Sequence, residues 1–202
     1  MNIVLATRNR HKIDEIQTLL QEMNIRVLSL QDFPGLPDVV EDRETFTGNA
    51  EKKAVEIAQF TGMMALGDDS GLCVDALDGA PGVYSARFAG EPANDAKNNQ
   101  KLLRLLDDTP VAKRTAHFVC VMSLATPEQV LHTVEGRVNG QILYKPRGQN
   151  GFGYDPLFYY PPYDATFAEI PPAKKNAVSH RANALKLMVA YIRQMPPNPS
   201  PR

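Results

Sequence analysis

Two adjacent carboxylates, Asp68 and Asp69, are candidates for metal binding or proton transfer in this sequence. They lie in the segment GDDSGL, residues 67–72, directly after the apolar run at 63–66. This order predicts a buried strand that ends in a tight turn carrying both acids. A purely structural turn is one interpretation, because Asp and Gly are common turn residues. The other is a metal or general-base site with Glu41 as a further acid, since Mg²⁺ needs only one or two carboxylates beside water and phosphate oxygens.

A polar loop follows the first predicted strand and immediately precedes a predicted helix. It supplies hydroxyl, amide and cationic groups at a helix N-terminus, which is a favourable place for a phosphate group. The spacing of a Walker phosphate loop is absent. A solvated polar turn therefore stays open as the alternative. The loop consists of Thr7, Arg8, Asn9, Arg10, His11 and Lys12.

A glycine-rich loop, GQNGFGYDP at residues 148–156, places Phe152 between two glycines. An uncovered aromatic ring can serve as a platform on which a nucleobase stacks. A plain turn whose Phe152 packs into the core is the competing interpretation.

Cationic residues gather at the start of the last predicted helix, where Lys175, His180 and Arg181 occur. A helix N-terminus disfavours positive charge, so these residues depart from what helix stability alone would select. This placement favours a role in ligand binding.

Composition narrows the class of protein. The chain has 202 residues, 43% of them hydrophobic and 22% charged, with a formal net charge of -1. These values are typical of a folded soluble protein and provide no basic field for a nucleic-acid polymer. No apolar run is long enough to cross a bilayer, and the N-terminal apolar segment is too short for a secretory signal. We therefore expect a cytoplasmic protein without a membrane partner.

The order of elements predicts an α/β fold, in which ligands collect beyond the carboxyl ends of the strands. No composition change marks a linker, so we expect one domain of two lobes around one cleft over residues 1–195. The proline-rich tail, 196–202, is predicted to be disordered. Predicted strands cover residues 2–6, 26–30, 63–66, 114–125 and 129–138, and predicted helices cover 13–23, 46–62, 94–107 and 180–194.

Five motifs follow one another in a fixed order over nearly the whole chain. They are Thr7-x-Asn9-x-x-Lys12; Glu41 with Phe46 and Asn49-Ala50; residues 67–72 with 79–87 (GAPGVYSAR); Phe152-Gly153-Tyr154-Asp155-Pro156; and Ser179-His180-Arg181. Together they resemble the inosine/xanthosine triphosphate pyrophosphatase family.

The resemblance implies a Mg²⁺-dependent hydrolase that cleaves non-standard purine nucleoside triphosphates such as ITP, dITP and XTP. The products would be the nucleoside monophosphate and pyrophosphate, and the activity would remove deaminated purines from the nucleotide pool. The implied fold is a mixed central sheet flanked by helices, with two lobes and an active-site cleft between them. Members of the family are usually homodimers.

Residue roles also follow from the resemblance. Asp69 would be the catalytic base, and Glu41, Asp69 and Asp68 would form the metal site. Lys174 stands next to Lys175, so the choice of the lysine that contacts the base stays open. A nucleotide sensor without hydrolysis and a structural protein are the alternative classes. The substrate-binding set would comprise Thr7, Arg8, Asn9, Arg10, His11, Lys12, Ser70, Phe152, Gly153, Tyr154, Asp155, Lys175, His180 and Arg181.

Overall fold

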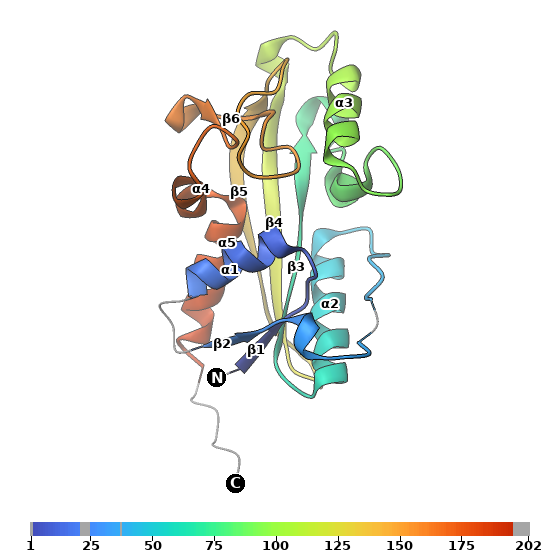
Figure 1. Cartoon of the computed structure of the whole chain (residues 1–202), viewed down its shortest axis with the longest axis vertical. Helices are drawn as coiled ribbons and strands as arrows, with labels where there is room; N and C mark the ends of the chain where they lie inside the picture. Colours follow the sequence, from blue (N-terminus) through green and yellow to red (C-terminus); the bar gives the residue numbers. More distant parts are fainter. Residues whose placement is uncertain (1, 21–24, 37, 196–202) are drawn as a thin grey trace. The chain divides into compact units, whose positions relative to one another are not determined.

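The computed structural model of the chain describes residues 2–20, 25–36 and 38–195, and the predicted disordered tail at 196–202 lies outside them. The chain divides into two compact units. Figure 1 shows the ribbon coloured by residue number, so that the segments of each unit can be found. The first unit contains residues 1–69, 120–136 and 181–202, and the second contains 70–119 and 137–180. Each unit is described by its own residues below.

A seven-stranded sheet has the order β2-β1-β3-β4-β5-β6-β7. β1 pairs in parallel with β2 and β3, whereas β6 pairs antiparallel with β5 and β7, which confirms the predicted mixed α/β class. The strands are β1 (Asn2–Leu5), β2 (Arg26–Leu28), β3 (Ala65–Val74), β4 (Thr115–Ala125), β5 (Val130–Ile142), β6 (Phe158–Tyr160) and β7 (Ala165–Thr166).

Most helices form where the apolar spacing predicts them. Two helices begin at residue types that are typical N-caps. Thr45 precedes α2 and its side chain accepts a hydrogen bond from the Gly48 amide. Asn94 precedes α3 and its side chain accepts a hydrogen bond from the Lys97 amide. The segment before the last helix contains a further helix, α4, that the sequence analysis does not predict; proline is well suited to its first position. The helices are α1 (Arg10–Leu20), α2 (Phe46–Thr61), α3 (Asp95–Leu105), α4 (Pro172–Val178) and α5 (His180–Ile192).

Within the described residues no helix has both the length and the apolar character that crossing a membrane requires.

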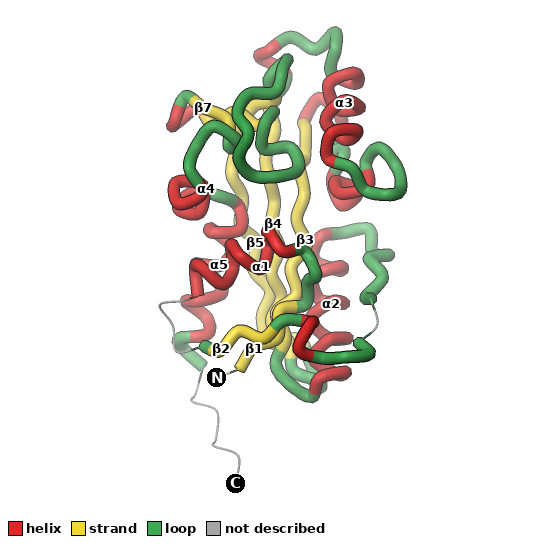
Figure 2. The backbone as a smooth tube through the Cα atoms, in the orientation of Figure 1, coloured by secondary structure: helices red, strands yellow, loops and turns green. Residues whose placement is uncertain are grey.

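The first unit has a hydrophobic core on each side of its strands. Figures 1 and 2 show α1 and α5 on one side of these strands and α2 on the other. Ile3 and Leu5 of β1 belong to the core beneath α1 and α5, whereas Val4 belongs to the core beneath α2. Successive side chains of a strand point to opposite faces, which explains this division.

The two adjacent aspartates lie inside β3 and not in a turn at its end, so the predicted tight turn is wrong. β3 continues to Val74, and its alternation assigns Gly67 and Asp69 to the α2 side and Asp68 to the side of α1 and α5. A strand can continue through two buried carboxylates here because side chains from the helices on both sides compensate their charges.

The contact between Gly67 and α2 is close enough to require a glycine. A Cβ atom added at Gly67 would lie 2.3 Å from the Ala50 carbonyl oxygen and 2.7 Å from the Ala54 nitrogen. The backbone of α2 therefore packs directly on β3. This brings side chains from the first two turns of α2 within reach of Asp69.

The second unit has a separate core, in which aromatic rings predominate. Phe158 lies 4.6 Å from Phe118 and 5.0 Å from Phe167, measured between ring centroids. Tyr154 is buried in the same core, which ties the glycine-rich loop to it.

Gly67→Ala is expected to lower the free energy of unfolding by about 1–3 kcal/mol, as overpacking of a tight contact does. The new methyl group would meet backbone atoms of α2, which cannot rotate away. Urea unfolding followed by far-UV circular dichroism measures the change. Adding Ala54→Gly should not restore stability, because the nearest obstructing atoms belong to the backbone. A Gly67→Ala variant as stable as the wild type would contradict this account of the contact.

Candidate active site

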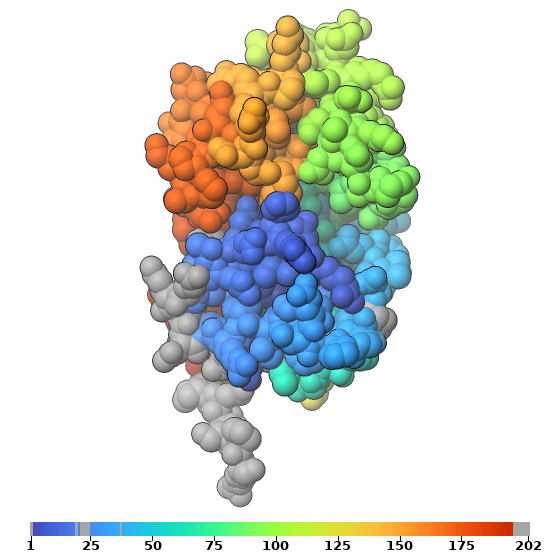
Figure 3. Space-filling model, in the orientation of Figure 1, coloured from blue at the N-terminus to red at the C-terminus, as the bar shows by residue number. Residues whose placement is uncertain are grey.

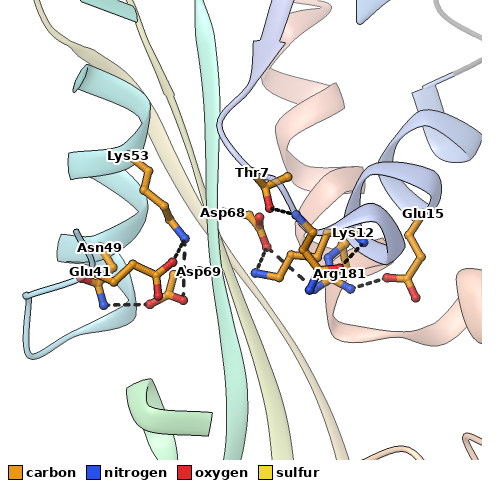
Figure 4. Close-up of polar contacts among 10 residues, drawn as sticks. Thr7, Lys12, Glu15, Glu41, Asn49, Lys53, Asp68, Asp69 and Arg181 are labelled. Carbon is orange, nitrogen blue, oxygen red and sulfur yellow. Dashed lines mark hydrogen bonds and ion pairs between the residues drawn. The ribbon is translucent and has the colours of Figure 1, made fainter. Parts of the chain in front are cut away.

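Asp69 meets the polar side chains of α2. Its side chain is buried, and its Oδ2 accepts a hydrogen bond of 3.0 Å from Asn49 Nδ2. Lys53 lies one helical turn after Asn49, and its Nζ is 3.9 Å from Asp69 Oδ1 and 2.7 Å from Glu41 Oε1. Figure 4 shows that Glu41 and Asp69 both approach this one ammonium group.

Asn49 also holds the segment that carries Glu41. Its Oδ1 accepts a hydrogen bond of 3.0 Å from the Arg43 amide, and its Nδ2 donates to the Arg43 carbonyl at 3.3 Å. One amide side chain thus connects the loop before α2 to the carboxylate in β3. This arrangement fixes two acids from distant parts of the sequence in one place.

The environment of Asp69 raises its pKa to about 6. Burial is the main cause and the nearby Glu41 carboxylate adds to it, whereas Lys53, Lys12 and the Asn49 hydrogen bond act in the opposite direction. The carboxyl group is therefore ionised at neutral pH and still basic enough to accept a proton. A general base is most effective with a pKa in this range.

Asp68 occupies the opposite face of β3, as Figure 4 shows, among cations from two helices. Its Oδ2 lies 2.8 Å from Lys12 Nζ and 3.8 Å from Arg181 Nη2. Burial by itself would raise the pKa of Asp68, but Lys12, Arg181 and Lys53 together lower it to about 2. Arg181 is also buried and forms an ion pair with Glu15. Asp68 therefore stays ionised and orients the two cations.

The predicted phosphate loop wraps the start of α1. The Asn9 amide donates to Thr7 Oγ1 at 3.2 Å, and Asn9 Oδ1 accepts from the Lys12 amide at 3.3 Å. This is the hydrogen bond by which a capping residue satisfies the first turn of a helix. The loop and the Lys12 side chain thus have a defined geometry.

The other residues of this loop are exposed, and the N-terminal segment forms part of the surface seen in Figure 3. Arg8 Nε lies 2.5 Å from Asp38 Oδ1, and its Nη2 donates to the Leu36 carbonyl at 3.0 Å. Arg8 therefore joins the loop to a second loop of the same unit. Arg10 and His11 are exposed at the beginning of α1.

The second unit contains a compact turn built around Asp155. The Asp155 amide donates to the Phe152 carbonyl at 3.2 Å, and Asp155 Oδ2 accepts from the Phe152 amide at 3.0 Å. Lys175 Nζ donates to the same oxygen at 2.7 Å and lies 4.7 Å from the centroid of the Phe152 ring. A Cβ atom at Gly151 would lie only 2.0 Å from Asp155 Oδ2, so this turn also requires a glycine.

The structure distinguishes the two neighbouring lysines. Lys175 is buried against Asp155, whereas Lys174 is exposed, with its Nζ 5.9 Å from the Tyr163 ring centroid. Of the two, Lys175 is thus the one that joins the turn around Phe152.

The remaining predicted residues lie in different surroundings. The buried His180 ring stacks on Phe118 in the second unit, with a centroid distance of 4.8 Å. The next residue, Arg181, belongs to the first unit, where it lies beside Asp68. Tyr154 is buried and its hydroxyl donates to the Ser85 carbonyl at 2.9 Å. Ser70 follows Asp69 in β3 and is half-buried.

The donor set around Lys53 fits a divalent cation. Glu41 and Asp69 provide two carboxylates that converge on one ammonium group. Burial by itself would lower the pKa of Lys53, but the charges of Asp68, Asp69 and Glu41 raise it. With Lys53 protonated, this group carries a net charge of about −1, which attracts a cation. Two carboxylates with water and phosphate oxygens suffice for Mg²⁺.

The roles of Asn49, Lys53 and Glu15 were not identified by the sequence analysis. Asn49 and Lys53 flank the apolar face of α2 at a spacing of four residues, and both are buried. A polar pair beside Ala50 and Ala54 is a signal that could have revealed a buried polar site. Glu15 carries no such signal, because an acid on an exposed helical turn has the same sequence pattern.

Asp69→Asn is expected to stabilise the metal-free chain at pH 8 by roughly 1–3 kcal/mol. The folded-state pKa of about 6 exceeds the ordinary value of 3.8, so ionising Asp69 costs stability once the pH rises through this interval. The advantage of Asn should therefore disappear below about pH 4. Urea unfolding in EDTA across this pH range measures it.

Asp68→Asn is the matched control, with the opposite expected sign. The pKa of Asp68 is lowered to about 2, so its ionised form stabilises the fold above the ordinary value of 3.8 and this variant should lose stability at pH 8. Two variants that change stability in the same direction at pH 8 would contradict the assigned environments.

Comparison with known proteins identifies relatives over nearly the whole chain. Residues 3–191 match the model of the Ham1 family. A dITP/XTP pyrophosphatase of Desulforamulus reducens is 53% identical over 195 residues, which cover 96% of this chain and 97% of that protein. The dITP/XTP pyrophosphatase of Geobacter sulfurreducens is 53% identical over 190 residues, with coverages of 94% and 96%.

Solved structures give the same result. The HAM1 protein from Coxiella burnetii superimposes with a TM-score of 0.89 at 42% identity, covering 96% of this chain and 100% of that one. A nucleoside-triphosphatase / dITP/XTP pyrophosphatase from Mycobacterium abscessus has a TM-score of 0.77 at 43% identity, with coverages of 96% and 100%. Because sequence and fold agree over nearly its full length, this chain belongs to the Ham1 family.

Proposed function

We infer that this chain hydrolyses non-standard purine nucleoside triphosphates, such as ITP, dITP and XTP, to the nucleoside monophosphate and pyrophosphate. The relatives that are named dITP/XTP pyrophosphatases support this reaction. The observation in the structure that carries the inference is a buried carboxylate, Asp69, with its pKa raised to about 6, beside a second acid, Glu41. Removal of deaminated purines from the nucleotide pool is the consequence of such an activity.

Asp69 would accept the proton of the attacking water as the water approaches the α-phosphorus. Asn49 orients this carboxylate through a hydrogen bond of 3.0 Å and leaves the second oxygen, Oδ1, directed toward Lys53. The reaction needs no covalent nucleophile. Catalysis then depends on positioning and on electrostatic stabilisation of the charge that develops on pyrophosphate.

Glu41 and Asp69 would hold Mg²⁺, which when bound neutralises phosphate charge and makes pyrophosphate a better leaving group. Lys53 keeps the two carboxylates together before the metal binds. Asp68 is also a metal ligand by the family resemblance, but its carboxylate lies on the other face of β3. We therefore propose that Asp68 serves the site by orienting Lys12 and Arg181.

The triphosphate would bind at the start of α1. Backbone amides of the loop from Thr7 to Lys12, the helix N-terminus and the Lys12 ammonium all favour a negatively charged ligand. Arg181 adds a guanidinium to this group, and Ser70 is proposed as a hydroxyl contact to phosphate. Arg8, Arg10 and His11 extend the positive surface of the loop.

The base would bind in the second unit, where Phe152 offers a ring for stacking. Asp155, Lys175 and His180 are the proposed polar contacts to its edge, and Gly153 and Tyr154 form the backbone of the turn. A base with a 6-oxo group presents an acceptor where adenine presents a donor. A buried site that leaves such a group unpaired can reject an analogue by roughly 10⁴–10⁵-fold.

Assembly as a homodimer and a cytoplasmic location are proposed from the family resemblance.

The function is tested by product analysis. The purified chain is incubated with Mg²⁺ and separately with ITP, XTP, dITP, ATP, GTP or dGTP, and the released pyrophosphate and orthophosphate are measured. Pyrophosphate from the first three nucleotides, with little from the others, is the expected result. Orthophosphate as the first product would mean attack at the terminal phosphate and would overturn the proposed reaction.

Glu41→Gln is expected to raise the half-saturating Mg²⁺ concentration for ITP hydrolysis by at least about tenfold, since changes even to groups that support metal ligands cost 10–100-fold. Asp42→Asn is the matched control, because Asp42 is the next carboxylate in the chain and pairs instead with Lys52 at 2.8 Å. Its Mg²⁺ dependence should equal that of the wild type. Equal behaviour of the two variants would remove Glu41 from the metal site.

A further inference from the structure

Two side chains of α3 form hydrogen bonds with the backbone of Gly153, one with its amide and one with its carbonyl, in the turn that carries Phe152. Asp95 Oδ2 accepts a hydrogen bond of 2.7 Å from the Gly153 amide, and Asn99 Nδ2 donates to the Gly153 carbonyl at 2.8 Å. Asp95 and Asn99 are four residues apart in the helix, so they lie on the same face of α3. All three residues belong to the second unit, and each of the two contacts joins residues more than 50 positions apart in the sequence.

Gly153 sets the path of the backbone directly after Phe152. It directly follows Phe152 and has a φ of +62°, a conformation that glycine adopts without the steric cost other residues incur. The turn is closed from Phe152 to Asp155 by a hydrogen bond of 3.2 Å, and Lys175 anchors its far end at Asp155. The α3 contacts add a support from a distant segment to the end of the turn next to Phe152.

We propose that Asp95 and Asn99 are positioning residues that preorganise the base-binding turn through Gly153. The proposal rests on the proposed function, because it concerns the same base-binding turn. Holding the turn in its bound conformation before the nucleotide arrives reduces the ordering cost of binding. The two residues should therefore affect recognition of the base, whereas binding of the phosphates should be independent of them.

A general contribution to helix stability is the competing explanation. Asp95 lies in the first turn of α3, where a carboxylate interacts favourably with the helix dipole. Asn94 caps the same helix by accepting a hydrogen bond of 2.9 Å from the Lys97 amide. Asn94→Ala therefore weakens the start of α3 without removing a contact to Gly153, and it provides the matched control.

The test compares steady-state ITP hydrolysis by the full chain and its variants. Asp95→Ala and Asn99→Ala should each raise KM about fivefold, the effect of losing one ordinary hydrogen bond, and leave kcat within about twofold. Asp95→Asn should restore a near-normal KM, since the amide oxygen can still accept from Gly153. Asn99→Asp should not, because a carboxylate cannot donate to the Gly153 carbonyl. Asn94→Ala should keep the KM of the wild type even if its melting temperature falls.

Product inhibition separates base recognition from phosphate binding. The inhibition constant of IMP should rise with KM in Asp95→Ala and Asn99→Ala, while that of pyrophosphate should stay at the wild-type value. An equal rise for both products, an unchanged KM, or a KM that also rises in Asn94→Ala would overturn the positioning role. A wild-type chain that releases no pyrophosphate from ITP would instead overturn the proposed function, so the two failures are distinguishable.

Discussion

The first unit depends on the need to compensate two buried carboxylates on opposite faces of one strand. Asp68 and Asp69 are adjacent in β3, so their side chains must point in opposite directions. A buried carboxylate without a partner would cost several kcal/mol. Helices on both sides therefore supply cations, Lys53 from α2 and Lys12 and Arg181 from α1 and α5. Gly67 permits the close approach of α2 that this compensation requires.

This constraint gives two identical side chains opposite properties. The cations around Asp68 outweigh its burial and lower its pKa to about 2, whereas burial and the Glu41 charge raise the pKa of Asp69 to about 6. Only Asp69 can therefore exchange a proton near neutral pH. A pair of titratable groups with divergent pKa values is a common way to divide structural and catalytic roles. In this chain the divergence of the two pKa values follows from the pleat of a single strand.

Local patterns in the sequence were enough to predict most helices and strands. The helix at Phe46–Thr61 and the strand at Thr115–Ala125 follow from spacing that depends only on nearby residues. The turn predicted at GDDSGL was wrong because local propensity favours a turn there, and the cations that allow a strand come from distant residues such as Arg181. Lys53 was missed for the same reason, because its partners are 12 and 16 residues away.

The near-neutral charge of the chain is compatible with a highly anionic substrate. The formal net charge is only -1, so attraction over long distances contributes little. Close to the start of α1, Asp68 pairs with Lys12 and Arg181, and Glu15 pairs with Arg181. In the proposed triphosphate site these carboxylates would hold the cations in place before the ligand arrives, which would lower the cost of ordering long side chains on binding. Selectivity can then arise from the base, because the phosphate contacts are common to all nucleoside triphosphates.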